Sequence, residues 1–304
     1  MPTQSPRFRL FLTVLLVAVF LVIGRLILNI TQPPQVFNAQ RAYRDVQDQV
    51  ALGARTPGSP AHTALQDYIV KTLQTSGWTV KTQSGNYAGK TLVNLIGKRG
   101  SQRPWIILAA HYDSRLLADK DPNPELRNQP VPGANDGASG VAVLLELART
   151  LPKETDKEIW LVFFDAEDQG EIPGWEWIMG SRYFVSQLDR HPDAVVVIDM
   201  VGDAHLRIPK ERNSDPQLIQ EIWSVAHELG YQEYFVDADG LSILDDHIPF
   251  LEQSIPAVDL IDFEYPYWHT TQDLPDKVSP FSLEIVGRTL YHWITYSETK
   301  TPSN

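Results

Sequence analysis

Four apolar segments of the sequence each end at side chains that can ligate a metal ion or transfer a proton. The four groups are His111-Tyr112-Asp113, Asp165-Ala166-Glu167-Asp168, Asp199 and Trp268-His269-Thr270. A fifth candidate, Asp136, lies in the turn Gly133–Gly137, directly before an apolar helical segment. Imidazole and carboxylate groups without sulfur suit a catalytic zinc ion, which uses three protein ligands and leaves one position open. The residue types therefore indicate a zinc site.

A carboxylate that stands beside a metal ligand can act as the general base of a reaction. Glu167 and Asp168 are adjacent, and adjacent side chains at a strand end project in different directions, so only one of them easily reaches the metal. The other is then free to transfer protons. Each candidate also has a structural explanation, since an aspartate such as Asp136 often caps a helix. Five such groups at one sheet edge favour the functional interpretation.

The elements that must position these side chains alternate between apolar strands and helices. The predicted strands Trp105–Ala110, Ile159–Phe164 and Ala194–Ile198 are apolar throughout, which is typical of strands covered on both faces. The other predicted elements are strands at 79–82, 92–97 and 256–261 and helices at 39–52, 59–75, 137–150, 181–188, 216–229 and 279–296. We therefore predict an α/β fold, a three-layer sandwich around a mostly parallel, mixed sheet. Such sheets bind ligands outside the carboxyl ends of their strands.

Composition and charge exclude several classes of protein. The 304 residues include no cysteine, which excludes a disulfide framework, zinc ligation by sulfur and a thiol nucleophile. Lys and Arg number 26 against 38 Asp and Glu, so the net charge is -12. An acidic chain without a basic cluster is not expected to bind nucleic acid. The 43% apolar content is sufficient for a sizeable core.

The N-terminal stretch 10–30 is mostly apolar and carries no charge apart from Arg25. It reaches the roughly 20 residues of a membrane helix if the Arg25 side chain extends to the interface. Arg7 and Arg9 precede the stretch, so we expect residues 1–9 to stay cytoplasmic and the body of the chain to cross the membrane. A cleaved signal peptide is the alternative, although no cleavage site with small residues follows the stretch.

These observations predict the organisation of the whole chain. It consists of a cytoplasmic N-terminus at 1–9, a transmembrane signal-anchor at 10–30, a linker at 31–38 and a catalytic domain at 39–304. The catalytic domain is expected on the extracytoplasmic side, which is the periplasm or exterior of a bacterium or the lumen in a eukaryote. Cleavage of the N-terminal segment would instead release a secreted protein.

Six short motifs resemble those of the M28 zinc peptidase-like superfamily. They are HYDS at 111–114, GANDGASG at 133–140, FFDAEDQG at 163–170, IDMVG at 198–202, DDHIPF at 245–250 and YWHTTQD at 267–273. The resemblance covers about 100 to 297 and implies a zinc-aminopeptidase-like fold. It leaves two activities open. A glutaminyl-peptide cyclotransferase converts the N-terminal glutamine of a peptide or protein to pyroglutamate, whereas a metalloaminopeptidase hydrolyses N-terminal residues.

The resemblance also implies roles for individual residues. The shared zinc ion would be held by Asp136, Asp168 and His269, with Glu167 as acid and base. Aminopeptidases of the superfamily bind a second zinc ion, for which His111 and Asp199 are candidates, with Asp136 bridging. Animal cyclotransferases keep such residues and use one zinc ion, so we expect one ion here and a second is possible. An inactive binding ectodomain is disfavoured by the intact ligand set.

Carboxylates in two motifs favour the cyclotransferase. The DDHIPF stretch is similar to the cyclotransferase version, in which the second aspartate, here Asp246, joins a catalytic hydrogen-bond network. Asp199 is a further catalytic candidate. An aspartate at position 168, in place of glutamate, is similar to bacterial cyclotransferases. GANDGASG at 133–140 is instead similar to the aminopeptidase form, so the two activities stay open.

Tryptophans near the predicted site also favour the cyclotransferase. Trp268 stands directly before the ligand His269, as in the cyclotransferase W-H-T motif. Trp175 and Trp177 lie in a polar loop after Glu167, similar to a cyclotransferase loop that supplies a pocket tryptophan. Loops on a rigid scaffold commonly carry binding residues. We therefore expect these three tryptophans to contact the substrate.

Overall fold

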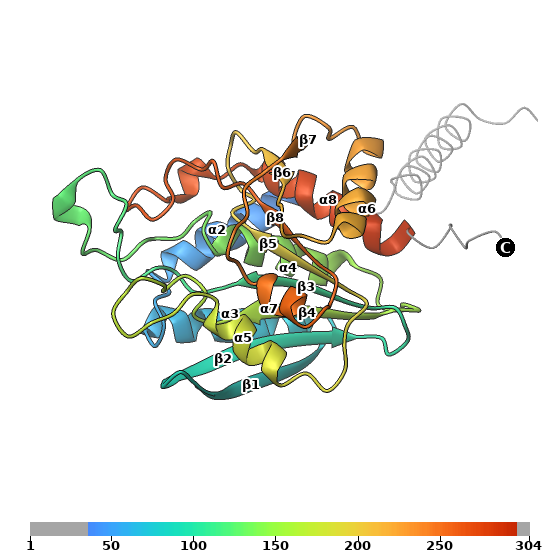
Figure 1. Cartoon of the computed structure of the whole chain (residues 1–304), viewed down its shortest axis with the longest axis horizontal. Helices are drawn as coiled ribbons and strands as arrows, with labels where there is room; N and C mark the ends of the chain where they lie inside the picture. Colours follow the sequence, from blue (N-terminus) through green and yellow to red (C-terminus); the bar gives the residue numbers. More distant parts are fainter. Residues whose placement is uncertain (1–35, 297–304) are drawn as a thin grey trace, which may run out of the picture. The chain divides into compact units, whose positions relative to one another are not determined.

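This computed structural model describes residues 36–296. A mixed six-stranded sheet forms the centre of this part of the chain (Figure 1). The strand order is β1-β2-β4-β3-β5-β8. The strands are β1 (Thr79–Tyr87), β2 (Lys90–Arg99), β3 (Trp105–His111), β4 (Glu158–Phe164), β5 (Ala194–Asp199) and β8 (Ala257–Ile261). Strands β4, β3, β5 and β8 are parallel, whereas β1 and β2 are antiparallel to their neighbours. Four carboxyl strand ends therefore meet at one edge.

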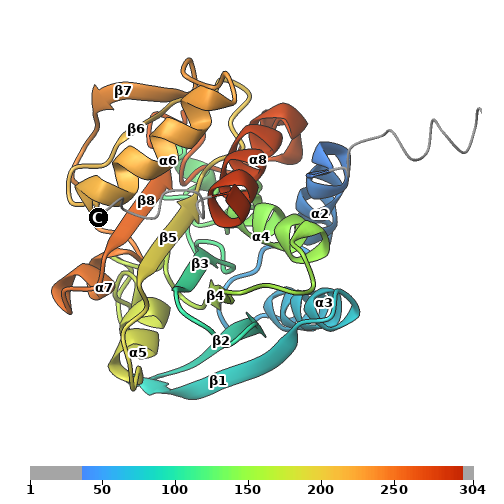
Figure 2. The same cartoon turned by 90° about the vertical axis from the view of Figure 1, so that its right-hand side faces the viewer.

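Helices lie on both faces of the sheet and make three layers (Figure 2). One face is covered by α3 (Pro60–Thr75), α4 (Ala138–Thr150) and α8 (Pro280–Tyr296), and α2 (Ala39–Ala51) packs on α4 and α8. The other face is covered by α5 (Met179–Ser186) and α7 (Ile248–Glu252). The remaining elements are α6 (Pro216–Glu228), the strand pair β6 (Ile208–Lys210) and β7 (Phe235–Asp239), and the short η1 (Pro124–Leu126) and η2 (Pro275–Lys277).

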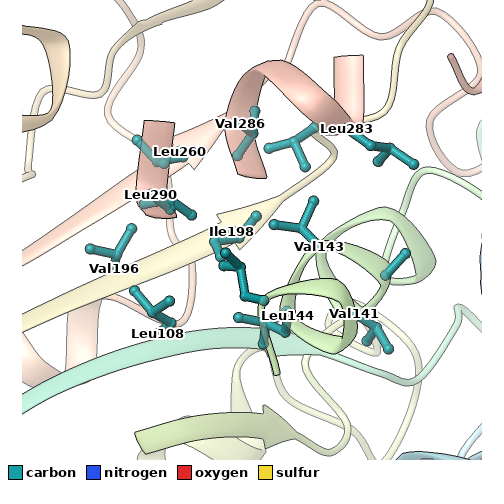
Figure 3. Packing of buried hydrophobic residues seen from close by; sticks show 14 of the residues in the cluster. Leu108, Val141, Val143, Leu144, Val196, Ile198, Leu260, Leu283, Val286 and Leu290 are labelled. Carbon is teal, nitrogen blue, oxygen red and sulfur yellow. The ribbon is translucent and has the colours of Figure 1, made fainter. Parts of the chain in front are cut away.

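The apolar strands separate two hydrophobic clusters. Figure 3 shows Leu108, Val196 and Leu260 of three neighbouring strands gathered with Leu144 of α4 and Leu290 of α8. The alternate residues of the same strands pack on the opposite face, against side chains of α5 and α7. All residues of β3, β4, β5 and β8 are consequently buried, which explains why these strands are apolar at nearly every position.

The structure confirms the predicted α/β class and mixed sheet, and it differs at one edge. The predicted strands at 79–82 and 92–97 are parts of a longer antiparallel hairpin formed by β1 and β2. Strand β1 alternates between exposed and half-buried residues and contains no apolar run. As an edge strand it needs none, so its full length carries little hydrophobic signal.

The predicted membrane helix at 10–30 lies outside the described residues, as do residues 1–9 and most of the linker 31–38. These segments and their boundaries therefore stay predictions. Within 36–296, none of the helices combines the length and the apolar character that crossing a bilayer requires.

Candidate active site

Asp136, Asp168 and His269 converge at the carboxyl edge of the sheet. Their side chains are buried, and one potential ligand atom from each lies within 4.8 Å of the others. His269 Nε2 is 2.8 Å from Asp168 Oδ1 and 3.8 Å from Asp136 Oδ2. The three residues come from the turn before α4, the segment after β4 and the loop after β8. Three separate segments thus contribute to one cluster.

This donor set fits a divalent cation such as zinc. Asp136 Oδ2 and Asp168 Oδ2 are buried without a hydrogen-bond partner within the described part of the chain. Burial and the nearby Asp136 carboxylate raise the pKa of Asp168 to about 6, and a bound cation would relieve this repulsion. Buried carboxylates are normally paired or coordinate metals. Imidazole nitrogen and carboxylate oxygen are both zinc donors, so these residues suit the predicted ion.

Asp136 also belongs to a second buried group, with His111 and Asp199. His111 Nε2 lies 3.1 Å from Asp136 Oδ1 and 3.2 Å from Asp199 Oδ1. The two oxygens of Asp136 therefore face different groups, Oδ1 toward His111 and Oδ2 toward His269. This geometry accommodates either a second metal ion bridged by Asp136 or direct hydrogen bonds from a protonated His111.

The turn before α4 keeps the Asp136 side chain available for ligation. The N-cap of α4 is Gly137, and no side chain caps the helix. Gly137 has a φ of 86°, and a Cβ atom there would lie only 2.7 Å from the Asp113 carbonyl oxygen. The buried Asp273 carboxylate accepts hydrogen bonds from the backbone N–H of Asn135 at 2.8 Å and of Asp136 at 3.1 Å. The helix-cap explanation for Asp136 is therefore excluded.

Glu167 lines the pocket with a buried carboxylate next to the ligand candidate Asp168. One buried carboxylate, that of Asp113, accepts hydrogen bonds from the backbone N–H of Glu167 at 3.0 Å and of Asp168 at 3.3 Å. This arrangement fixes the turn and sends the two side chains in different directions. Burial, reinforced by the charges of Asp245 and Asp168, raises the pKa of Glu167 well above its ordinary value. A carboxylate with a raised pKa can accept and return a proton near neutral pH.

A pocket of about 240 Å³ opens over these carboxylates. This volume is smaller than the roughly 300–1,000 Å³ of pockets for drug-sized ligands, and it suits a single amino-acid side chain. Five carboxylates line it: Asp136, Glu167, Asp168, Asp199 and Asp245. Its other lining residues are Trp177, Leu241, Ser242, Ile243, Leu244, Ile261, Phe263 and Trp268. The pocket thus combines a group of acids with apolar walls.

Two of the three predicted tryptophans line the pocket. The ring of Trp268 stacks on the His269 imidazole with centroids 3.7 Å apart, and the Trp177 ring stacks on the same imidazole at 6.1 Å. Trp175 does not line this pocket, and its contact with the substrate stays a prediction. Its ring packs on an apolar cluster that includes residues of β2 and α5, with the Lys90 ammonium group 4.0 Å from its centroid. This cluster gives Trp175 an apolar contact away from the pocket.

The adjacent aspartates Asp245 and Asp246 point to different places. Asp245 lines the pocket beside Glu167 and Asp199. Asp246 is fully buried and does not line the pocket, and burial together with Asp245 raises its pKa well above the ordinary value. Asp245 thus lines the pocket directly. Asp246 lies close enough for its charge, like that of Asp245, to raise the pKa of Glu167, so its place in the catalytic network stays a prediction.

A carboxylate that the sequence analysis did not identify supports His269. Asp119 Oδ1 lies 3.4 Å from His269 Nδ1, on the side of the ring opposite the metal ligands. Arg115 donates two hydrogen bonds to the Asp119 carboxylate, each at 2.9 Å, and one to the Asp168 carbonyl oxygen at 3.1 Å. A carboxylate behind a ligand histidine fixes the orientation of its ring. Arg115 and Asp119 thus connect two of the three ligand residues.

The backbone around His269 is held by the same segment. His269 has a φ of 55°, an uncommon conformation for a residue other than glycine. The Lys120 N–H donates to the His269 carbonyl oxygen at 3.2 Å. Asp121 accepts from the N–H of Thr271 at 3.0 Å and from its hydroxyl at 2.7 Å. Such strain persists only where surrounding contacts determine the conformation, and these contacts supply that support.

Comparisons with known proteins place this site in a family. Residues 93–294 match the sequence profile of Peptidase family M28. The chain is similar to a glutaminyl-peptide cyclotransferase of Boiga irregularis, which is 26% identical over 87% of this chain and 83% of its own length.

Two solved structures share the fold over nearly their whole length. Porphyromonas gingivalis glutaminyl cyclase is 34% identical, with a TM-score of 0.80 and coverage of 85% of this chain and 98% of the other. A Zn-dependent exopeptidase from Parabacteroides distasonis is 32% identical, with a TM-score of 0.80 and coverage of 86% and 99%. Together with the profile match, these similarities show that the chain belongs to peptidase family M28.

Proposed function

We propose that this protein is a zinc-dependent glutaminyl-peptide cyclotransferase, which converts the N-terminal glutamine of peptides or proteins to pyroglutamate and releases ammonia. The observation that carries this proposal is the small pocket lined by Glu167, Asp136, Asp168 and two tryptophans, whose rings stack on the third ligand candidate, His269. Its similarity to glutaminyl cyclases over most of the chain supports the same reaction.

The reaction joins two groups of one residue. The α-amine nitrogen forms a bond to the γ-carbonyl carbon, and the bond from that carbon to the amide nitrogen breaks. A zinc ion held by Asp136, Asp168 and His269 would polarise the γ-carbonyl as a Lewis acid. Because both reacting groups belong to the same residue, the main task of the pocket is to hold the side chain folded back.

The carboxylates and aromatic rings of the pocket divide this work. Glu167 accepts a proton from the attacking amine and delivers it to the departing nitrogen, so that ammonia leaves. Asp199 and Asp245 line the same pocket and would accept hydrogen bonds from the amine. Trp177 and Trp268 form apolar surfaces that hold the folded side chain and exclude water.

One observation favours a second candidate, an aminopeptidase. The group formed by His111, Asp136 and Asp199 has the geometry for a second metal ion, and two metal ions activate water well for hydrolysis. The similar Zn-dependent exopeptidase fits this alternative. We propose one zinc ion for the cyclotransferase, and a second ion belongs to this alternative.

A substrate comparison tests the two candidates. The purified full chain is incubated with a Gln-peptide and a Leu-peptide of otherwise identical sequence, and bound zinc is counted by elemental analysis. We expect release of ammonia from the Gln-peptide, no cleavage of the Leu-peptide and one zinc ion per chain. Cleavage of the Leu-peptide without cyclisation would show an aminopeptidase. If neither peptide reacted, the remaining hypothesis would be an inactive binding ectodomain.

We also propose that the stretch 10–30 anchors the protein in a membrane, with the catalytic domain on the extracytoplasmic side. The support is the apolar length of this stretch and the two preceding arginines, Arg7 and Arg9. We expect the full chain to sediment with membranes and to resist carbonate extraction. A mature N-terminus near residue 39 would instead identify a cleaved signal peptide and a secreted enzyme.

A further inference from the structure

Two leucines stand exposed at the opening of the candidate active-site pocket. Leu241 and Leu244 are 59% and 51% exposed, and both line the pocket. Elsewhere in residues 36–296, only Leu52 and Phe281 are large apolar side chains with comparable exposure. Single exposed apolar residues are ordinary, but two on one short segment beside a binding pocket indicate a contact surface.

Hydrogen bonds hold this segment in its exposed position. The buried Glu211 carboxylate accepts a hydrogen bond from the Ile243 N–H at 2.9 Å. The Arg212 N–H donates to the Leu241 carbonyl oxygen at 3.0 Å, and the Asn213 side-chain amide donates to the Ile243 carbonyl oxygen at 3.1 Å. Both sides of the segment 241–244 are therefore fixed, and its leucines form a preformed surface.

Four contacts fix the Glu211 carboxylate in turn, the first being a hydrogen bond from the Asn213 N–H at 2.9 Å. Its Oε2 atom accepts hydrogen bonds from the Ser214 N–H and hydroxyl, each at 2.8 Å. The same oxygen lies 3.2 Å from Nε2 of the fully buried His247. The anchor of the leucine segment is thus buried beneath the surface, so an exchange of the exposed leucines leaves it unchanged.

The path of a bound peptide determines what these leucines contact. The reacting groups of the first residue must reach Glu167 and the metal-ligand group, which are buried. Among the residues that line the pocket, only Leu241, Ser242 and Leu244 are exposed, so the rest of the peptide leaves the pocket past this segment. The side chain of the second residue must therefore lie at this opening.

We propose that Leu241 and Leu244 form a subsite for the second residue of the substrate and select bulky apolar side chains there. This inference rests on the proposed function, because it assumes a substrate bound by its N-terminal residue. An acidic second residue is disfavoured for two reasons. Its side chain gains no apolar contact with the leucines, and its negative charge approaches a pocket lined by five carboxylates.

The test compares kcat/KM for peptides of one length that differ only in the second residue: Gln-Leu, Gln-Ser and Gln-Glu. A single lost apolar contact of this kind changes kcat/KM by about tenfold or more. We expect the unchanged protein to prefer the Gln-Leu peptide over the Gln-Ser peptide by about tenfold. The double variant Leu241→Ser, Leu244→Ser should lose this preference through a lower kcat/KM for the Gln-Leu peptide alone.

The matched control is Leu52→Ser, which makes the same chemical change at an exposed leucine at the end of α2. It should keep the preference, and zinc content and melting temperature should be the same in all three proteins. Equal rates for the Gln-Leu and Gln-Ser peptides in the unchanged protein would overturn the subsite. A uniform loss with all peptides in the double variant would also overturn it, because the leucines would then support the pocket without selecting a residue.

Failure of the proposed function has a different signature. If no Gln-peptide is cyclised, the same comparison is made with cleavage of Leu-Leu and Leu-Ser peptides. A Leu-Leu preference that disappears in the double variant would support the subsite and overturn the cyclotransferase. The absence of any second-residue preference in that series would overturn the subsite as well.

Discussion

Replacing Glu167 with glutamine will lower kcat for cyclisation of a Gln-peptide by about 10²–10⁴-fold, the contribution expected of general acid–base catalysis. Glutamine is nearly isosteric with glutamate, but its amide cannot accept the proton of the attacking amine. The Asp113 carboxylate holds the backbone N–H of residue 167, so the exchange leaves the turn in place. KM should change little because the shape of the pocket is kept. Steady-state kinetics and elemental analysis measure these effects.

A matched control makes the same chemical change on an exposed side chain. Glu176 lies in the loop that follows and is exposed, so Glu176→Gln should keep both zinc and kcat. Asp168→Asn should weaken zinc binding, since a neutral amide is a poorer ligand than a carboxylate. If Glu167→Gln lost zinc, and Asp168→Asn kept zinc but lost turnover, then Glu167 would be the metal ligand and Asp168 the acid and base. If both variants kept zinc and full activity, the site assignment would be wrong.

Sequence was sufficient for those parts of the site that follow from strand direction. The apolar runs identify β3, β4, β5 and β8, and parallel strands bring their carboxyl ends to one edge. His111 and Asp199 are the last residues of β3 and β5, and Asp168 follows β4 closely. Their proximity could therefore be predicted before any coordinates. The metal group needed in addition the loop residue His269 and the turn residue Asp136, which the motifs supplied.

Sequence was not sufficient where a side-chain direction depends on tertiary contacts. Asp245 and Asp246 are identical in type, and only the course of the chain before α7 decides which one faces the pocket. Trp175 and Trp177 occupy the same polar loop. Trp177 reaches the pocket past Gly170, where a Cβ atom would lie 2.0 Å from its ring, whereas Trp175 finds an apolar cluster elsewhere. No periodicity in the sequence records such choices.

Asp119 illustrates a different limit. It lies in a segment without regular secondary structure and outside every motif. The contacts of this segment are distant in sequence, since the neighbouring Asp121 accepts a hydrogen bond from Thr271, 150 positions further along the chain. The contact of Asp119 with His269 arises only when β3 and β8 both lie in the folded sheet, on either side of β5. Arg115 shows the same dependence, because its hydrogen bond to the Asp168 carbonyl oxygen requires the folded sheet edge. Residues that support metal ligands from loops are thus found from the structure.

The largest effect on metal binding is expected for His269→Ala, which should lose zinc and activity together. His269 Nε2 is the only nitrogen in the group with Asp136 and Asp168. Without it, two carboxylates share the site and repel one another, as the raised pKa of Asp168 shows. Competition of the holoenzyme with a chromogenic chelator measures the zinc dissociation constant without any reference to turnover.

Asp119→Asn should raise the zinc dissociation constant by about 10–100-fold, the range typical of carboxylates behind ligand histidines. Arg115 and His269 hold the pKa of Asp119 below its ordinary value against the effect of burial, so the carboxylate is charged where it faces the His269 ring. The cobalt-substituted variant should show an altered d–d spectrum, because the ring orientation is no longer fixed. Asp119→Glu should restore part of the affinity.

The control for both variants is Asp276→Asn, since the Asp276 side chain is 67% exposed and pairs only with Lys277 within the described residues. It should bind zinc like the unchanged protein. Unaltered zinc affinity and cobalt spectrum in Asp119→Asn would show that Asp119 only stabilises its own segment. Normal zinc content in His269→Ala would have a stronger consequence. The zinc ion would then have to bind to the neighbouring group of His111, Asp136 and Asp199. The metal that polarises the substrate would in that case lie next to Asp199 and not next to Trp268.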